Sequence, residues 1–324
     1  MLKSPEITKN LKKVELTLEN KIRGGLGNQI FQYLAGKYIL ENSGLHKHNL
    51  ELSWFHHTSS HHPLSQRKPD LLELLSESAK AATSLETGEK KRRKIFQFPQ
   101  GTHGKVLYAK ENQLQGNPKE ETPLSRATSK IQSIKKSRIK QKIKLEGFWQ
   151  DPRPYLDRLS IYSKDLEGHA SNKPSTPSEP YISAHIRRGD YVKVENCALE
   201  YSSRFSLAQY IALALEILPQ HTRNMPLVVT TDDPGWCQKW LGGLSTTQNR
   251  RVLISESGNA ITDWLILKNS HLNIISNSTF SFTAAMLNTT NTDQKIRCIM
   301  PLWYSRMITV HQKGWTQIEG SLDL

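Results

Sequence analysis

One segment of this chain, residues 181–192, places positive charge where a parallel sheet would bind an anion. An apolar run there is followed at once by two arginines, a glycine and an aspartate: Arg187, Arg188, Gly189 and Asp190. The apolar run indicates a buried strand, and ligands of α/β sheets bind beyond the carboxyl ends of such strands. Arginine suits phosphate because it can donate two parallel hydrogen bonds. Since neighbouring side chains of a strand point to opposite faces, we expect only one arginine to meet the ligand.

A glycine-rich turn at residues 24–29 comes directly before an expected helix. It is not a dinucleotide fingerprint, because Ile30 stands where the third glycine belongs, and it lacks the Gly-Lys-Ser/Thr of a P-loop. The backbone N–H groups around Gly25 and Gly27 could face a phosphate or a sugar. The alternative is a tight turn in which Asn28 is only the N-cap of the helix.

A third segment, residues 276–281, is dense in small hydrogen-bonding side chains at an expected strand-to-helix junction. A capped helix start would account for the serines alone. The functional interpretation places backbone N–H groups and hydroxyls around a phosphate group, and its residues are Ser278, Thr279, Phe280 and Ser281.

Candidate metal ligands are few and poorly arranged. Asp232 and Asp233 are adjacent, so in an extended segment they face opposite ways, and the chain contains no Asp-x-Asp. They could equally be turn residues before Pro234. Two histidine pairs, at 56–57 and 61–62, show no coherent ligand geometry. We therefore expect neither a metal nor a bound cofactor.

Composition narrows the class of protein. The 324 residues carry a formal net charge of +14, which favours nucleic acid, an anionic membrane face or a phosphorylated substrate as partner. No RNP, KH or zinc signature is present, and the basic runs at 89–94 and 130–144 lie apart from the motifs. The three cysteines form no CxxC pair. With no apolar run near the roughly 20 residues that span a bilayer, a cytoplasmic protein is expected.

The motifs fall into an alternating pattern of strands and helices. A strand is expected at 14–18 and a helix at 28–40, after which the pattern weakens from 46 to 144. The isoleucines of 130–144 are spaced as in a basic amphipathic helix. Three prolines, three serines and a threonine make 171–180 the best linker. Beyond it, strands at 181–186, 227–231, 252–254, 273–275 and 296–300 alternate with helices, which predicts a doubly wound parallel sheet.

In their order along the chain, these motifs resemble the bacterial-type α-1,2-fucosyltransferases, which use GDP-fucose. The likeness rests on the run GGLGNQ-x-FQY at 24–33, the His-x-Arg-Arg of 185–188 and the serine-rich junction, and it covers most of 145–305. Asp263 and His271 also match family positions. One departure is Phe282-Thr283, where family members typically carry two tryptophans.

The resemblance implies an α/β fold of two facing Rossmann-like domains (GT-B-like) with the donor site in the cleft. The N-terminal, acceptor-side domain would span 1–170, with a basic variable region at 46–144. A linker at 171–180 would lead to a C-terminal GDP-fucose-binding domain at 181–324.

The resemblance also implies roles for single residues. Arg187 would pair with the β-phosphate, His185 would lie near the guanosine, and Asp232 would meet the guanine or ribose. The segment 278–281 would surround the diphosphate. Gly25, Gly27 and Asn28 would contact the ligand from the N-terminal domain, and Arg187 and Asn28 are the catalytic candidates. Arg188 is expected to be structural, held by Asp190 or another carboxylate.

The implied reaction is inverting, metal-independent transfer of L-fucose from GDP-β-L-fucose to the 2-hydroxyl of a terminal β-galactoside. The acceptor would be a galactose-terminated oligosaccharide or glycolipid, and the basic run could hold the enzyme peripherally on the anionic inner membrane face. Alternatives within the transferases are α-1,6 linkage or another GDP-sugar. From other classes, a basic nucleic-acid-binding protein and a Rossmann oxidoreductase remain open.

Overall fold

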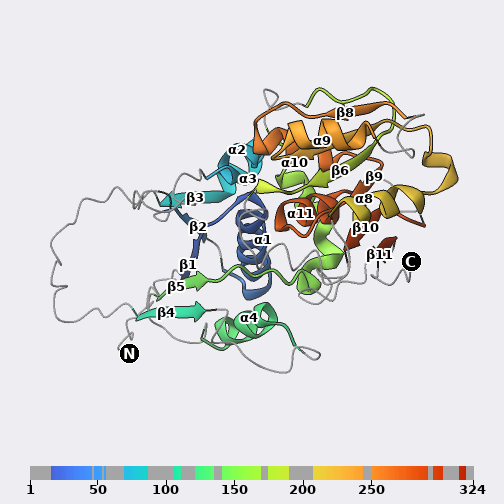
Figure 1. Cartoon of the computed structure of the whole chain (residues 1–324). Helices are drawn as coiled ribbons and strands as arrows, with labels where there is room; N and C mark the ends of the chain where they lie inside the picture. Colours follow the sequence, from blue (N-terminus) through green and yellow to red (C-terminus); the bar gives the residue numbers. More distant parts are fainter. Residues whose placement is uncertain are drawn as a thin grey trace, which may run out of the picture.

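The computed structural model describes residues 16–45, 47–52, 55, 69–86, 105–110, 121–134, 141–168, 174–189, 207–243, 250–290, 295–301 and 314–318. These residues form two β-sheets with helices packed against them (Figure 1). Every strand pair within the two sheets is parallel. Parallel strands need helical crossovers, so the predicted α/β class is confirmed.

The N-terminal sheet has the strand order β3-β2-β1-β5-β4. Its strands are β1 (Leu16–Lys21), β2 (Lys47–Glu51), β3 (Thr83–Glu86), β4 (Lys105–Lys110) and β5 (Gln141–Glu146). The helices and 3-10 turns of this part are α1 (Leu26–Ser43), α2 (Leu71–Leu74), α3 (Glu77–Ala82), α4 (Pro123–Ile134), η4 (Arg153–Arg158), α5 (Leu159–Tyr162) and η5 (Ser163–Asp165).

The C-terminal sheet has the strand order β11-β10-β9-β6-β7-β8. Its strands are β6 (Ile182–Ile186), β7 (Leu227–Thr231), β8 (Val252–Ile254), β9 (Leu272–Ile274), β10 (Cys298–Pro301) and β11 (Trp315–Ile318). Its helices are α8 (Leu207–Glu216), α9 (Pro234–Leu241), α10 (Ala260–Lys268) and α11 (Thr279–Leu287), with a 3-10 turn η7 (Gln220–Thr222).

The hydrophobic core of the N-terminal sheet extends through α1 to α10, α11 and β10, while most buried apolar side chains of the C-terminal sheet form clusters of their own. Helix α1 lies between the strands of the N-terminal sheet and α11 (Figure 1). Phe31 of α1 stacks on Phe282 of α11 with 5.9 Å between ring centroids, and both rings are fully buried. Full burial of a phenylalanine side chain stabilises the folded protein by roughly 1.5–3 kcal/mol. The described N- and C-terminal parts are therefore joined by core packing as well as by the chain.

The short turn η5 adds polar ties at the same junction. The Ser163 hydroxyl donates to the carbonyl of Leu287 at 2.8 Å, and the buried Lys268 ammonium donates to the carbonyl of Ser163 at 3.1 Å. Asp165 accepts from the Tyr33 hydroxyl at 2.8 Å and forms an ion pair with Lys37. The turn thus contacts α1, α10 and α11 together.

Most expected elements are found, with shifted ends. Strands β7 and β8 have the predicted bounds. Helix α1 begins at Leu26, two residues before the expected start, and ends at Ser43; the next residue, Gly44, has a φ of 62°, which suits glycine. Asn28 therefore lies inside the first turn, and its interpretation as the N-cap is wrong, because Gly25 holds that position.

The prediction of a helix at 130–144 is wrong. Helix α4 ends at Ile134, and residues 141–146 form β5. Ile131 and Ile143 are each 2% exposed and pack into the core, so they offer no apolar face to a membrane. The structure therefore gives no support to membrane contact through such a helix.

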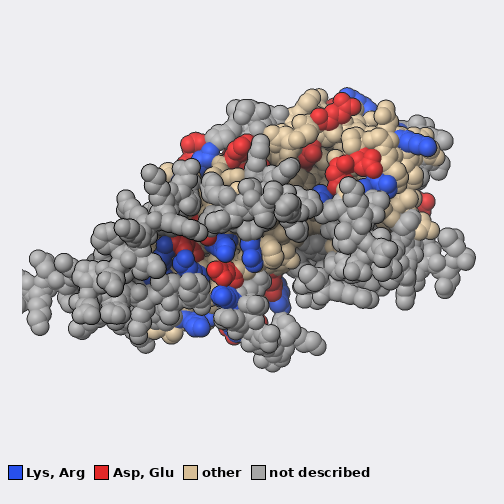
Figure 2. Space-filling view, turned by 60° about the vertical axis from the view of Figure 1, so that its left-hand side comes forward, with Lys and Arg blue, Asp and Glu red and all other residues tan. Residues whose placement is uncertain are grey.

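Charge on the described surface is mixed. Figure 2 shows Lys and Arg side chains lying beside Asp and Glu side chains. Glu19, for example, forms ion pairs with Lys142 and Lys144 across β1 and β5. Among the described residues no helix is long and apolar enough to cross a membrane. Cys237 and Cys298 are buried free thiols, and Cys197 lies outside the described residues.

Candidate active site

The carboxyl end of β6 places His185 in a buried polar environment. Its Nδ1 lies 2.7 Å from the Ser276 hydroxyl, and its ring lies 5.2 Å from that of Phe280. Burial, followed by the nearby charge of Arg187, lowers the pKa of His185 to about 3. The imidazole is therefore neutral at physiological pH and can take part in hydrogen bonds without adding charge.

The two arginines after β6 have different partners. Arg187 Nη1 lies 3.1 Å from Asp232 Oδ2, whereas Arg188 Nε donates to Asp233 at 2.9 Å. The Arg188 guanidinium also lies 4.1 Å from the centre of a Trp236 ring. The structure thus anchors Arg188 with a carboxylate and an aromatic ring, as expected of a structural arginine. Asp190, the other expected partner, lies outside the described residues.

The aspartates after β7 hold this loop in place. Asp233 caps α9 by accepting from the backbone N–H of Trp236 at 3.1 Å, and the hydrogen bond from Arg188 is the main reason that its pKa is lowered. Asp232 accepts from the backbone N–H of Arg188 at 2.7 Å. Both carboxylates therefore already bind arginine. This arrangement orients Arg187, and it leaves guanine or ribose recognition by Asp232 as a prediction.

Helix α11 begins at the serine-rich junction. Ser278 is its N-cap and accepts from the backbone N–H of Phe280 at 3.3 Å. Ser281 is fully buried, and its hydroxyl donates to backbone carbonyls of Ser276 and Ser278 at 3.4 and 3.3 Å. The hydroxyls of Ser278 and Ser281 are thus engaged in building the helix start. Of the predicted group, Thr279 and Phe280 are half-buried at the first turn.

The first turns of α1 and α11 meet at Gly27. A Cβ atom on this glycine would lie 2.3 Å from the carbonyl carbon of Thr279 and 2.4 Å from the nitrogen of Phe280. Only a residue without a side chain allows two backbones to approach so closely. Each helix carries about half a positive charge at its N-terminus. The structure therefore brings the glycine-rich and serine-rich segments together, with two like-charged helix ends side by side.

Asn28 is held by a residue that the sequence did not single out for a role. Its Oδ1 accepts from Gln150 Nε2 at 2.9 Å, which points the Asn28 amide group Nδ2 away from that partner and toward Gly24. Gly24 has a φ of 83°, a conformation that favours glycine. Gln150 therefore fixes the orientation of the Asn28 amide.

Asp263 is a further carboxylate, matched to the family by resemblance. It accepts from the hydroxyls of Ser255 and Ser257 at 2.6 and 2.8 Å, and burial raises its pKa. His271, the other position matched by resemblance, packs edge-on against His221 at 6.1 Å between ring centroids. Asp263 lies in the first turn of α10, the helix that packs against β6 and β7.

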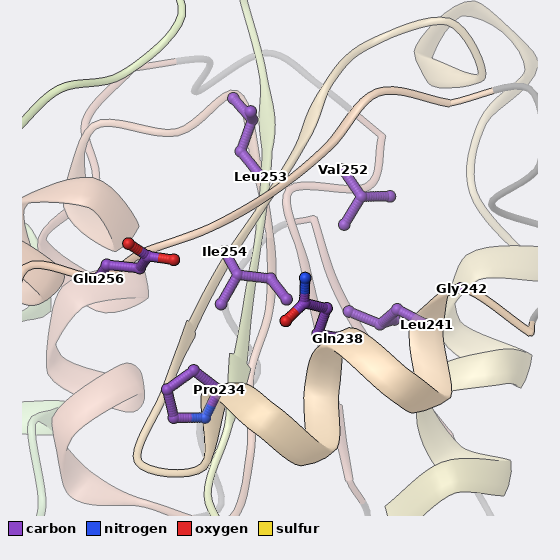
Figure 3. Close-up of a pocket in the computed structure, with 8 residues that line it drawn as sticks. All are labelled: Pro234, Gln238, Leu241, Gly242, Val252, Leu253, Ile254 and Glu256. Carbon is purple, nitrogen blue, oxygen red and sulfur yellow. The ribbon is translucent and has the colours of Figure 1, made fainter.

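A pocket of about 380 Å³ lies between α9 and the edge strand β8 (Figure 3). Apolar side chains line it together with the Gln238 amide and the Glu256 carboxylate. Its first residue, Pro234, directly follows Asp233. The pocket includes none of the predicted donor-site residues, so it is a neighbour of the arginine loop and a separate cavity.

No cluster of three or more metal-ligating side chains occurs among the described residues. The histidine pairs at 56–57 and 61–62 lie outside them. Asp232 and Asp233 each pair with a different arginine, an arrangement suited to orienting cations of the protein. The groups gathered at this edge are two helix N-termini, Arg187 and a neutral imidazole. Chemically, such a set can hold an anion and stabilise a departing phosphate.

Comparison with known proteins places this arrangement in a family. The model of glycosyl transferase family 11 matches residues 145–319. An alpha-1,2-colitosyltransferase of Escherichia coli is 25% identical over 306 residues, covering 88% of this chain and 92% of that protein. A galactoside 2-alpha-L-fucosyltransferase (SEC1) of Bos taurus is 27% identical over 158 residues, which are 47% of this chain and 40% of that protein.

A solved structure shares the fold. The structure of POFUT1 in complex with GDP-fucose has a TM-score of 0.50 at 14% identity, covering 88% of this chain and 97% of that chain. The family match spans more than half of the sequence and includes the arginine loop, both aspartates and the start of α11. The chain belongs to glycosyl transferase family 11 and is a glycosyltransferase.

Proposed function

We propose that this protein is a galactoside 2-alpha-L-fucosyltransferase, which transfers L-fucose from GDP-β-L-fucose to the 2-hydroxyl of a terminal β-galactoside with inversion. The observation that carries the proposal is the meeting of the α1 and α11 N-termini at Gly27, where the Phe280 ring lies beside His185 of β6. Two positive helix ends side by side favour the binding of an anion in front of them. A diphosphate supplies that anion.

Arg187 is the proposed phosphate ligand. Its guanidinium has five N–H donors, so it can keep its contact with Asp232 and still bind a phosphate oxygen. When the bond from fucose to the phosphate breaks, GDP gains negative charge. Donors aimed at that charge lower the barrier without reorganising. Arg187 and the helix ends would take the part that a metal ion plays elsewhere, so we propose that transfer needs no metal.

The donor would lie along the carboxyl edge of the C-terminal sheet, in a cleft that faces the N-terminal domain as in a GT-B arrangement. Neighbouring strands lie about 4.8 Å apart, so a nucleotide whose phosphates meet β6 has its base beyond β7. Asp232 and His185 remain the candidates for contact with the nucleoside. Asn28, oriented by Gln150, lies on the acceptor side, where its amide can hold the sugar or the attacking hydroxyl.

A second donor deserves a direct comparison. The Escherichia coli relative covers nearly the whole of both chains and is named a colitosyltransferase. Colitose is L-fucose without its 3-hydroxyl, so the two donors differ by a single hydrogen-bonding group. A site that hydrogen-bonds this hydroxyl would reject GDP-colitose, because its buried partner would be left unpaired.

The test is incubation of purified protein with lactose and either GDP-fucose or GDP-colitose in the presence of EDTA, followed by mass spectrometry and NMR assignment of the linkage. We expect 2′-fucosyllactose from GDP-fucose. If only GDP-colitose gives a product, the proposed donor sugar is wrong. If the product is α-1,6-linked, the proposed linkage is wrong. If EDTA abolishes the activity, the proposal that transfer needs no metal is wrong. If GDP does not bind, measured by calorimetry, the donor site itself is wrong.

A further inference from the structure

We propose that Phe148, with Arg23 against it, is the shelf on which the acceptor galactose stacks beside Asn28. This inference rests on the proposed function and names the acceptor subsite of the same reaction. Phe148 is one of the exposed large apolar side chains among the described residues, with 36% of its surface accessible. It belongs to the aromatic turn that follows β5, and the proposed donor site does not use this turn.

The backbone of this turn is unusual. Trp149 has a φ of 53°, in the left-handed region that costs an ordinary side chain about 1–2 kcal/mol. Its side chain is 1% exposed and anchors the turn in the core. Gly147 has a φ of 158°, close to extended backbone. The strained residue is thus held by packing, and the neighbour that this geometry turns outward is Phe148. Such outliers cluster at functional sites.

The ring of Phe148 lies within the acceptor side of the site. The Arg23 guanidinium carbon is 4.8 Å from the ring centre. A Cβ atom on Gly24 would be 3.5 Å from Phe148 Cε1 and 3.1 Å from Asn28 Nδ2, so the ring edge and the Asn28 amide flank the same backbone position. Gln150, two residues after Phe148, holds the other side of that amide.

This cluster has the chemistry of a galactose site. An aromatic ring presents a negative face to weakly positive C–H groups, and the C3–H, C4–H and C5–H bonds of β-galactose lie on one side of the sugar. Arg23 lies over the ring, and 36% of the Phe148 surface is still accessible to a ligand. The polar neighbours, Arg23 and Asn28, can hydrogen-bond the hydroxyls that project around a stacked sugar.

The cluster is also next to the proposed donor site. Asn28 follows Gly27, whose backbone touches the first turn of α11. A galactose stacked on Phe148 beside Asn28 would therefore be adjacent to the point where the two helix ends meet. The sugar would come from the N-terminal side and the nucleotide from the C-terminal side.

The test compares Phe148→Ala and Phe148→Tyr with the unchanged protein, using KM for lactose and for GDP-fucose. Loss of stacking should raise the KM for lactose about tenfold in Phe148→Ala, while Phe148→Tyr keeps it within about twofold. The KM for GDP-fucose, and the slow hydrolysis of GDP-fucose by water, should stay unchanged in both. Ile217→Ala, at another exposed apolar residue, is the matched control and should change neither constant.

Saturation-transfer NMR with lactose and GDP gives a readout that needs no turnover. The galactose C3–H to C5–H protons should receive magnetisation from the unchanged protein and lose it in Phe148→Ala. An unchanged lactose KM and an unchanged NMR pattern in Phe148→Ala would overturn the shelf. If the protein binds lactose through Phe148 but transfers no fucose, the proposed reaction fails and the acceptor subsite stands.

Discussion

Two adjacent arginines of one loop do different work because their carboxylate partners differ. Arg188 is fixed by Asp233 and by the ring of Trp236, whereas Arg187 pairs with Asp232. Asp233 also caps α9, so the Arg188 side ties the loop to a helix. Arg187 is the proposed phosphate ligand, and the alternation of side chains along a strand predicted such a division of roles.

Replacing Arg187 with alanine should remove nearly all transfer while the protein still folds. The developing phosphate charge would lose its side-chain cation, and the loss of one such group costs about a hundredfold or more in kcat. The measurement is the initial rate of fucosyl-lactose formation, with circular dichroism to verify folding. Arg251→Ala, at an exposed arginine paired with Glu179, is the control and should retain full activity.

A surviving activity above about a tenth in Arg187→Ala would exclude this residue from the transition state. Arg188→Ala should behave differently. It removes a partner of Asp233 and a ring contact, so it should weaken the loop and lower the thermal stability as well as the rate.

At the scale of elements, the site depends on how closely α1 and α11 approach. Gly27 and the Thr279–Phe280 backbone lie more than 250 positions apart in the sequence, and the packing of Phe31 on Phe282 holds the two helices together. The helix ends can act on one anion only if this contact is kept.

Gly27→Ala should destabilise the protein and weaken GDP binding together. The added methyl group would meet backbone atoms at 2.3 to 2.4 Å, so the helices must shift, and overpacking of this kind costs about 1–3 kcal/mol. The measurement is the free energy of unfolding in urea, with GDP affinity by calorimetry. Gly235→Ala in α9 is the matched control, because a Cβ there meets nothing within 4 Å.

The control should be as stable as the unchanged protein, or more stable by up to about 1 kcal/mol, because alanine favours helix. Equal stability of Gly27→Ala and Gly235→Ala would mean that the helix contact is not tight in solution.

The elements were predictable where the local pattern was strong. The strands β7 and β8 are short apolar runs bounded by polar residues, and both were located correctly. The stretch 130–144 was misjudged because its isoleucines fit a helical period, although Lys142, Ile143, Lys144 and Leu145 alternate as in a strand. The lysines there face Glu19 on β1, and such a non-local partner leaves no local signal.

At the scale of the whole molecule, the site joins side chains that the sequence keeps far apart. The residues at strand ends could be predicted, because parallel strands gather their carboxyl ends at one edge. The pairing of Asn28 with Gln150 and the contact of Gly27 with α11 could not, because both depend on tertiary packing between the two sheets. The sequence thus identified candidate residues more readily than it showed how they meet.

Stability of the molecule should fall in mild acid because of two buried histidines. Burial, followed by the charge of Lys37, lowers the pKa of His48 to about 4, and His185 behaves alike with a pKa of about 3. Between pH 6.5 and these values the unfolded chain takes up protons that the folded protein excludes. The stability that these neutral imidazoles contribute is fully present above about pH 6.5. Below that pH the free energy of unfolding falls by about 1.4 kcal/mol per pH unit for each histidine.

The check is the free energy of unfolding in urea at pH 7.5, 6.0 and 5.0. It should decrease toward pH 5.0, and His48→Gln should reduce the slope. Ile217→Ala, which removes no titratable group, should leave the slope unchanged. A profile that is flat from pH 7.5 to 5.0 would mean that these imidazoles are not buried in neutral form.

The most direct test of the central claim, that Arg187 and the two helix ends form a diphosphate site, is calorimetric binding of GDP and GMP to the unchanged protein and to Arg187→Ala. The unchanged protein should bind GDP at least about tenfold more tightly than GMP, because only GDP carries the β-phosphate. Arg187→Ala should bind GDP at least about tenfold more weakly than the unchanged protein, with a smaller effect on GMP. If Arg187→Ala binds GDP as tightly as the unchanged protein does, the phosphate site lies elsewhere and the account is wrong.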